Sequence, residues 1–379
     1  MDFSLTKQQE LFLQMIRAFA EKEVKPIAAE VDEEERFPME NVRKMAKLGI
    51  MGIPFPTEYG GAGGDNILYS MAVEELSRVC GTTGVIVSAH TSLCGAPLYE
   101  FGTPQQKEKY LTMIASGEWI GAFGLTEPNA GTDASAQQTM AVKEGDHYVL
   151  NGSKIFITNA GPADVYIVFA MTDKSLGTRG ISAFIVEKNF PGFSIGKHDK
   201  KLGIRGSATC ELIFENCIVP EENLLGKEGK GFGIAMKTLD GGRIGIAAQA
   251  LGIAQGAMDE TVKYVKERKQ FGKSIASFQN TQFQLADLET KIQAARFLVR
   301  SAAFKKDKGE AYSVDAAMAK LFASETAMET TIKAVQFHGG YGYTREYPVE
   351  RMMRDAKITE IYEGTSEVQR MVIASKLLK

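Results

Sequence analysis

The hydrophobic period of the chain changes twice along its length, and this limits the folds that it can adopt. Up to about residue 118, apolar residues recur at helical spacing. Between Gly121 and Pro220, short alternating or β-branched runs replace them, such as His147 to Leu150 and Lys154 to Ile157. After Gly231 the helical spacing returns and lasts to the end. We therefore expect a mainly α chain with a central β-domain (α+β), divided into residues 1–118, 119–228 and 229–379.

Cap and turn residues predict where individual elements begin and end. Thr6 to Gln9 fits a capping box, and Thr103 followed by Pro104 and Gln106 predicts the start of another helix. The pair Asn151-Gly152 is typical of a hairpin turn between two strands. The C-terminal helical segments are separated at Gly272, Gly309 and Gly339-Gly340. They are long and their connections are short, which indicates an antiparallel bundle.

Composition excludes several classes of function. The 379 residues are 44% hydrophobic and 24% charged with a net charge of -3, so no basic excess indicates nucleic acid or an anionic membrane as a partner. Met1 to Leu5 opens an amphipathic segment rather than a signal peptide, and no apolar run of about 18 residues follows, so we expect a cytoplasmic protein. The four cysteines form no C-x-x-C pair and the four histidines are scattered, so we expect no metal site.

The stretch from Ile361 to Glu367 holds a candidate catalytic carboxylate. Glu363 stands between Tyr362 and Gly364, just after a basic helical pattern over residues 347–357. At a helix end the carboxylate can point into a cavity, where burial would raise its pKa and make it a proton acceptor near neutral pH. The alternative is a solvated glutamate before a helix-ending glycine, which these three residues alone favour.

Two further stretches could contact a planar cofactor. The loop from Phe123 to Asp133 offers threonine hydroxyls and free backbone N–H groups, which suit a polar heterocycle or a phosphate. An ordinary interdomain loop is the alternative. The run from Phe156 to Asn159 places an aromatic ring and a hydroxyl beyond a strand, where the ring could lie against a cofactor.

Three stretches of the C-terminal region could bind phosphate or carbonyl groups. In Asp240 to Arg243, two glycines interrupt a helical pattern, which lowers the stability of a helix. They could let a ligand approach the backbone, or they could form a simple kink. Arg268, beside Phe271, is a second guanidinium suited to phosphate. The glycine turn over residues 336–342 follows a helix, but no βαβ unit surrounds it, which disfavours a Rossmann fold.

In this order, the motifs resemble the acyl-CoA dehydrogenase family over the whole chain, and most closely its short-chain, butyryl-CoA members from anaerobic bacteria. The resemblance is carried by residues 125–133, 240–245, 267–272, 336–342 and 361–367. It implies an N-terminal helical domain, a middle antiparallel β-domain and a C-terminal four-helix bundle. It also implies FAD as cofactor, a homotetramer built as a dimer of dimers, and an electron-transferring flavoprotein as partner.

The resemblance assigns roles to individual residues. Glu363 would be the catalytic base, taking the α-proton of an acyl-CoA thioester while the β-hydrogen leaves as hydride to flavin N5. Residues expected beside the flavin are Phe123, Leu125, Thr126, Thr132, Phe156, Thr158, Thr365 and Glu367. Residues expected to hold the ADP half of FAD from a neighbouring subunit are Arg268, Phe271, Gln279, Gln336, Gly339 and Gly340. Residues expected to face the acyl-CoA are Thr132, Asp240, Arg243, Tyr362 and Gly364.

Two departures from the family pattern refine this interpretation. Phe156 stands where relatives commonly have tryptophan, which implies a thinner contact with the flavin. Gly242 stands where members with a relocated base carry glutamate, which favours the short- to medium-chain group. We therefore expect an FAD-dependent dehydrogenase that interconverts butyryl-CoA and crotonyl-CoA.

Two alternatives stay open. One is an enoyl-CoA reductase of the same family acting on another acyl group, such as aryl-acryloyl-CoA. The other belongs to a different class, a non-catalytic helical assembly protein, and the presence of Glu363, Arg243 and Arg268 argues against it.

Overall fold

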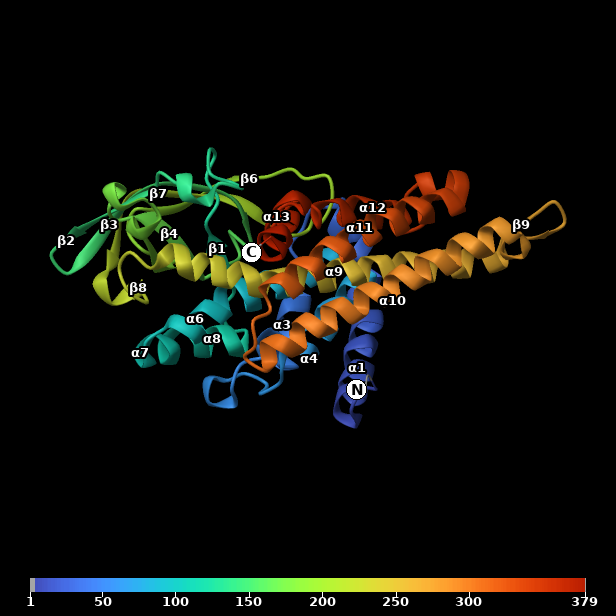
Figure 1. The fold of residues 1–379 in the computed structure, drawn as a ribbon, viewed down its shortest axis with the longest axis horizontal. Coiled ribbons are helices and arrows are strands. Elements are labelled where there is room, and N and C mark those ends of the chain that lie inside the picture. Colours follow the sequence, from blue (N-terminus) through green and yellow to red (C-terminus); the bar gives the residue numbers. More distant parts are fainter. Residues whose placement is uncertain (1–3, 379) are drawn as a thin grey trace.

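The subunit is elongated, with the strands of its large sheet gathered at one end and long helices extending to the other (Figure 1). The computed structural model describes residues 4–378, so residues 1–3 of the predicted amphipathic start lie outside the described part. Within the described residues no helix is both long and apolar enough to cross a membrane.

The N-terminal region is helical, as the period predicts. Thr6 caps the first helix through a capping box with Gln9, and Thr103 caps a later one in the same way with Gln106, so both predicted starts are confirmed. The helices are α1 (Lys7–Phe19), α2 (Ala28–Glu33), α3 (Met39–Lys47), α4 (Asn66–Val79), α5 (Gly81–Ser88), α6 (Ala96–Phe101), α7 (Pro104–Gln106) and α8 (Thr112–Ser116).

The middle region is an eight-stranded sheet in the order β6-β7-β3-β2-β4-β5-β8, with β1 added beside β4. Its neighbouring strands are antiparallel except that β4 pairs in parallel with β1 and β2. The fold class expected from the sequence is thus confirmed. The strands are β1 (Gly121–Gly124), β2 (Met140–Glu144), β3 (His147–Thr158), β4 (Val165–Met171), β5 (Ile181–Glu187), β6 (Phe193–His198), β7 (Thr209–Pro220) and β8 (Leu224–Leu225).

The predicted hairpin turn at Asn151-Gly152 is wrong. Both residues lie inside β3, which runs unbroken through the site of the expected turn. Asn151 instead forms hydrogen bonds with Asn216 at an irregularity in the pairing with β7, and a Cβ at Gly152 would meet Oγ1 of Thr139 at 2.6 Å. The glycine therefore permits close packing within the sheet. The real turn joins β2 to β3 through residues 145 and 146.

The C-terminal region is a bundle of long helices. The breaks after its first three helices contain the glycines named from the sequence, as expected. The helices are α9 (Gly231–Glu267), α10 (Gln279–Asp307), α11 (Ser313–His338), α12 (Val349–Ile358) and α13 (Ser366–Leu377). A short hairpin of β9 (Lys269–Gln270) and β10 (Lys273–Ser274) joins α9 to α10 at the far end of the subunit (Figure 1). The glycines of α9 do not interrupt it. A Cβ at Gly252 or Gly256 would overlap backbone carbonyls of α4, so these glycines let the two helices pack closely.

Polar groups anchor α12, the helix that precedes Glu363. Its buried Asp355 accepts a hydrogen bond of 2.5 Å from the backbone N–H of Ile204 in the loop between β6 and β7. Arg351 donates to the carbonyl of Val79 at the end of α4. These bonds tie α12 to both other regions and fix where the chain leaves the helix toward Glu363.

Candidate active site

Glu363 lies in the link between α12 and α13 with a backbone conformation that side chains rarely adopt. Its φ is 52° and that of Gly364 is 91°. Non-glycine residues with positive φ are strained and persist where the surrounding structure enforces them. Here the carbonyl of Gly364 accepts hydrogen bonds from Lys320 Nζ (2.6 Å) and Gln369 Nε2 (2.7 Å), and Thr365 caps α13. The link is therefore held in one shape.

The carboxylate of Glu363 is buried and has an unpartnered oxygen. Its Oε2 is closed off from solvent and has no hydrogen-bond partner among the described residues. Burial raises the pKa of Glu363 to about 7, while the charges of Lys320 and Arg243 act in the opposite direction. A carboxylate with free lone pairs and a pKa near neutrality can accept a proton from a weak carbon acid.

Helix α9 forms the wall facing this carboxylate. A Cβ atom at Gly242 would overlap Oε2 of Glu363 and would meet Cδ2 of Leu93 at 2.8 Å. Arg243 is buried beside it and donates to Asp240 at 2.6 Å, while its Nε has no partner within residues 4–378. Burial lowers the pKa of Arg243 despite the nearby carboxylates. The structure thus brings Asp240, Arg243 and Glu363 together.

The hydroxyl of Tyr362 is hydrogen-bonded to another side chain of the protein. Its hydroxyl donates to Oε1 of Gln249, whose amide nitrogen donates to the carbonyl of Gly81 at 2.9 Å. Burial raises the pKa of Tyr362 well above its usual value, so the hydroxyl stays protonated. Its hydroxyl therefore anchors the link to α9 and α5.

The predicted flavin residues of β1 and β3 form a second group, at the sheet. The carbonyl of Thr126 accepts from the backbone N–H of Ile155 at 2.9 Å, which joins the loop after β1 to β3. Buried Lys154 reinforces the junction by donating to Glu127 (2.7 Å) and to the carbonyl of Leu125 (3.2 Å). Burial alone would raise the pKa of Glu127, but Lys154 and backbone donors lower it. The pair is ionised and holds the loop in place.

Phe156 stands at a bulge of β3 and points outward. The pairing with β7 slips between Lys154 and Ile157, and Phe156 has a φ of 59°. Bulges of this kind re-aim side chains. The ring is 63% exposed although it is large and apolar, as expected for a side chain that covers a flat ligand. Thr158, two residues on, ends the same strand. Phe123 of β1 packs edge-on against Phe169 of the neighbouring strand β4.

Four of the residues assigned to the ADP half form a third group, at the opposite end of the subunit. Arg268, Gln336, Gly339 and Gly340 line one surface pocket of 490 Å³ with Tyr341. Nothing lies within 4 Å of a Cβ placed on either glycine, so the backbone there is open to a ligand. Figure 1 shows the β9 hairpin, next to this pocket, far along the long axis from the sheet.

Some predicted residues do not join these groups. Thr132, Phe271, Gln279 and Glu367 are exposed, and Phe271 at the hairpin tip is 92% exposed. Thr365 faces its own helix as the cap of α13. The assignments of these residues stay predictions.

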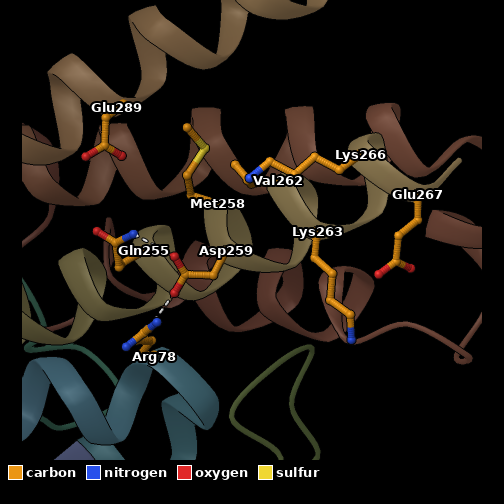
Figure 2. Close-up of a pocket in the computed structure, with 9 residues that line it drawn as sticks. All are labelled: Arg78, Gln255, Met258, Asp259, Val262, Lys263, Lys266, Glu267 and Glu289. Carbon is orange, nitrogen blue, oxygen red and sulfur yellow. Dashed lines mark hydrogen bonds and ion pairs between the residues drawn. The ribbon is translucent and has the colours of Figure 1, made fainter. Parts of the chain in front are cut away.

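Another pocket, of 670 Å³, contains none of the predicted residues (Figure 2). It lies along α9 between α4 and α10. Its floor is closed by Asp259, which accepts from Arg78 Nε at 2.5 Å and from Gln255 Nε2 at 2.9 Å. Asp259 is neutralised by its ion pair with Arg78 and the pocket holds no predicted site residue, so we do not place the reaction there.

Sequence reasoning missed Lys320 and Gln249, although both contact the link that carries Glu363. Lys320 is fully buried on α11 in phase with Ala316 and Ala323. A lysine at an apolar position of an alanine-rich helix is a signal that could have been noticed, because such a charge requires a buried partner.

A sheet lies between two helical regions, and the buried carboxylate of Glu363 faces the central helix α9, a fold and site that suit a dehydrogenase. The chain belongs to the acyl-CoA dehydrogenase family. It matches the descriptions "Acyl-CoA dehydrogenase, N-terminal domain" over residues 6–118, "middle domain" over 122–217 and "C-terminal domain" over 229–378.

Individual relatives are similar over their whole length. A short-chain specific acyl-CoA dehydrogenase of Clostridium acetobutylicum is 68% identical, with both chains fully covered. The solved butyryl-CoA dehydrogenase from Megasphaera elsdenii is 55% identical with a TM-score of 0.99, again over all of both chains. A structure described as "Electron transferring flavoprotein of Acidaminococcus fermentans: Towards a mechanism of flavin-based electron bifurcation" is 60% identical with a TM-score of 0.99, over all of both chains.

Proposed function

We propose that this chain is an FAD-dependent short-chain acyl-CoA dehydrogenase that interconverts butyryl-CoA and crotonyl-CoA. The observation that carries the proposal is the buried, unpartnered carboxylate of Glu363 with a pKa of about 7. The short-chain and butyryl-CoA relatives support the choice of a four-carbon acyl group.

The residues around Glu363 suit abstraction of the α-proton of a thioester. Glu363 takes this proton on Oε2, and the strained link keeps the carboxylate aimed at one place. Its own backbone N–H is a donor for the substrate carbonyl, where negative charge develops. Arg243 keeps a buried, unused N–H for a polar group of the substrate. FAD, when bound, supplies the hydride acceptor.

The chain fits FAD at two separate places. The exposed ring of Phe156, the hydroxyls of Thr126 and Thr158 and the firmly held loop after β1 suit the flat ring system. The pocket of Arg268 and Gln336 suits the pyrophosphate and adenosine, because a guanidinium and open glycine backbone bind phosphate well.

The distance between these two places supports a homotetramer. They lie toward opposite ends of one subunit (Figure 1), so each FAD would use the sheet of one copy and the far pocket of another. Helix α10 also exposes Phe283 and Phe304, 59% and 49% exposed, three heptads apart and so on one face. A second copy would cover this apolar face.

We also propose that electrons pass to or from an electron-transferring flavoprotein, because the similar structure from Acidaminococcus fermentans bears the name of such a protein. We propose the cytoplasm as the place where the enzyme works. The division into residues 1–118, 119–228 and 229–379 is kept as the proposed domain organisation.

The visible spectrum of the purified protein tests the proposal. We expect a yellow or green protein whose flavin absorbance falls when butyryl-CoA is added without oxygen. Crotonyl-CoA should restore the absorbance of the reduced protein. A colourless protein that neither retains FAD nor binds it when supplied would support the assembly-protein alternative instead.

A further inference from the structure

Lys320 is buried without a carboxylate in contact. Its side chain is fully inaccessible to solvent, and its one hydrogen-bond partner within residues 4–378 is the backbone carbonyl of Gly364, at 2.6 Å. Burying an ammonium group is costly unless nearby charges compensate, so its presence requires an explanation. Alanines before and after it on α11 pack well without any charge.

The carbonyl that Lys320 holds belongs to the residue after the base. Gly364 follows Glu363 directly, and both have positive φ. Lys320 approaches from α11 and Gln369 from α13, so two donors on different helices fix this one carbonyl. The ammonium therefore stands beside the base without an ion pair: within the described chain, Glu363 has no cation within 4.0 Å.

The charges around Glu363 come from several elements. Arg243 on α9 and Lys320 on α11 are the cations that act on it, and Tyr69 on α4 and the adjacent Tyr362 are protonated hydroxyls near it. Burial lowers the pKa of Lys320 to about 8, while the charges of Glu363, Glu360 and Glu367 act in the opposite direction. Arg243 is already committed to Asp240. Lys320 is thus the cation without a carboxylate partner of its own.

We propose that Lys320 is a positioning residue for the base: bound to the Gly364 carbonyl, its ammonium presents positive charge to Glu363 at a fixed place and leaves both carboxylate oxygens free for substrate. A cation in direct contact would occupy the lone pairs that must take the proton. This inference rests on the proposed function, since it concerns how that base is tuned. Burial alone would push the pKa of Glu363 higher, and Lys320 opposes this.

The test measures the protonation of Glu363 directly in the FAD-loaded protein. Infrared difference spectra over a pH series report the protonated carboxyl band, identified by its absence in Glu363→Gln. In Lys320→Met, which keeps a long apolar stem without charge, we expect the midpoint to rise by about one pH unit. Lys320→Arg retains the charge, and its midpoint should lie at or below that of the native protein.

Lys333→Met on the same helix is the matched control and should leave the midpoint unchanged. An unchanged midpoint in a folded Lys320→Met protein would overturn the proposal. If that variant does not fold, a raised midpoint in Lys320→Arg overturns it equally. Failure of the proposed function shows separately, as undiminished flavin reduction by butyryl-CoA in Glu363→Gln, whatever the titration gives.

Discussion

Glu363 and Gly242 share one space: the Oε2 atom of Glu363 lies where a side chain at position 242 would begin. Glycine inside a helix costs about 1 kcal/mol relative to alanine, so α9 accepts a loss of stability at this position. The loss is explained by the carboxylate, which could not reach its position beside α9 if residue 242 carried a Cβ. The α9 wall and the link after α12 are therefore fitted to each other.

Replacing Glu363 by glutamine should stop proton abstraction without disturbing the fold. Glutamine keeps the size and an acceptor oxygen but cannot take up a proton. We expect flavin reduction by butyryl-CoA to slow by about 10²- to 10⁴-fold, the contribution of a general base. Stopped-flow absorbance measures the rate, with FAD content and acyl-CoA binding as controls. Wild-type bleaching would remove Glu363 from the mechanism.

The same substitution should stabilise the protein above neutral pH. Burial raises the pKa of Glu363 from 4.5 to about 7, so the folded state holds the proton more tightly than the unfolded state. The native protein therefore loses stability as pH rises from about 4.5 through 7, by an amount on the order of 3 kcal/mol. Thermal unfolding of native protein and Glu363→Gln at pH 5 and pH 8 measures this. If the difference in unfolding temperature between Glu363→Gln and the native protein were the same at pH 5 and pH 8, the burial of a charged carboxylate would be contradicted.

Much of the fold was predictable because its signals are local. The capping boxes at Thr6 and Thr103 satisfy backbone donors within one turn, so neighbouring residues alone determine them. The hairpin at Asn151-Gly152 was predicted wrongly, because β7 pairs with β3 on both sides of the dipeptide and overrides its turn preference. Long-range pairing cannot be inferred from two residues.

The site was predictable only in part. Glu363 was selected as a candidate base through its motif; the structure adds its burial, and its role stays a prediction. Lys320 was missed because its structural role depends on a hydrogen bond to a carbonyl 44 residues further along the chain. The strain at Phe156 depends likewise on a slip in pairing between two strands, which the sequence of one strand does not encode.

Retention of FAD and assembly should be linked through the far pocket. Arg268 and Gln336 line it, and we assign them to the FAD of another subunit. Alanine at either position should reduce bound FAD and weaken the tetramer together. Flavin absorbance and sedimentation measure the two properties on one sample. An alanine variant that is monomeric yet retains full FAD would show that the assignment is wrong.

The dependence of the rate on acyl chain length should distinguish a butyryl-CoA dehydrogenase from enzymes acting on long-chain or aryl thioesters. We expect saturated C4 to C6 thioesters to reduce the flavin faster than C12 or longer ones, because similar family members include a short-chain specific acyl-CoA dehydrogenase and a butyryl-CoA dehydrogenase. Stopped-flow bleaching across the series measures this, with 3-arylpropionyl-CoA as an added substrate. A maximum at C12 would refute the short-chain assignment, and a maximum at the aryl thioester would favour the reductase alternative.

The shared space of Glu363 and Gly242 predicts that the base can be moved. In the double variant Glu363→Gly with Gly242→Glu, the carboxylate starts from α9 and reaches the region that Oε2 occupied, while the removed side chain makes room for it. We expect part of the rate lost in Glu363→Gly to return. Recovery should be incomplete, because the carboxylate now approaches the α-proton from another direction and small misplacements greatly reduce a rate.

Gly242→Ala is the matched control: it adds a Cβ without a base, displaces Glu363 and should slow the reaction. A double variant no faster than Glu363→Gly would show that the two positions do not serve the same reacting atom.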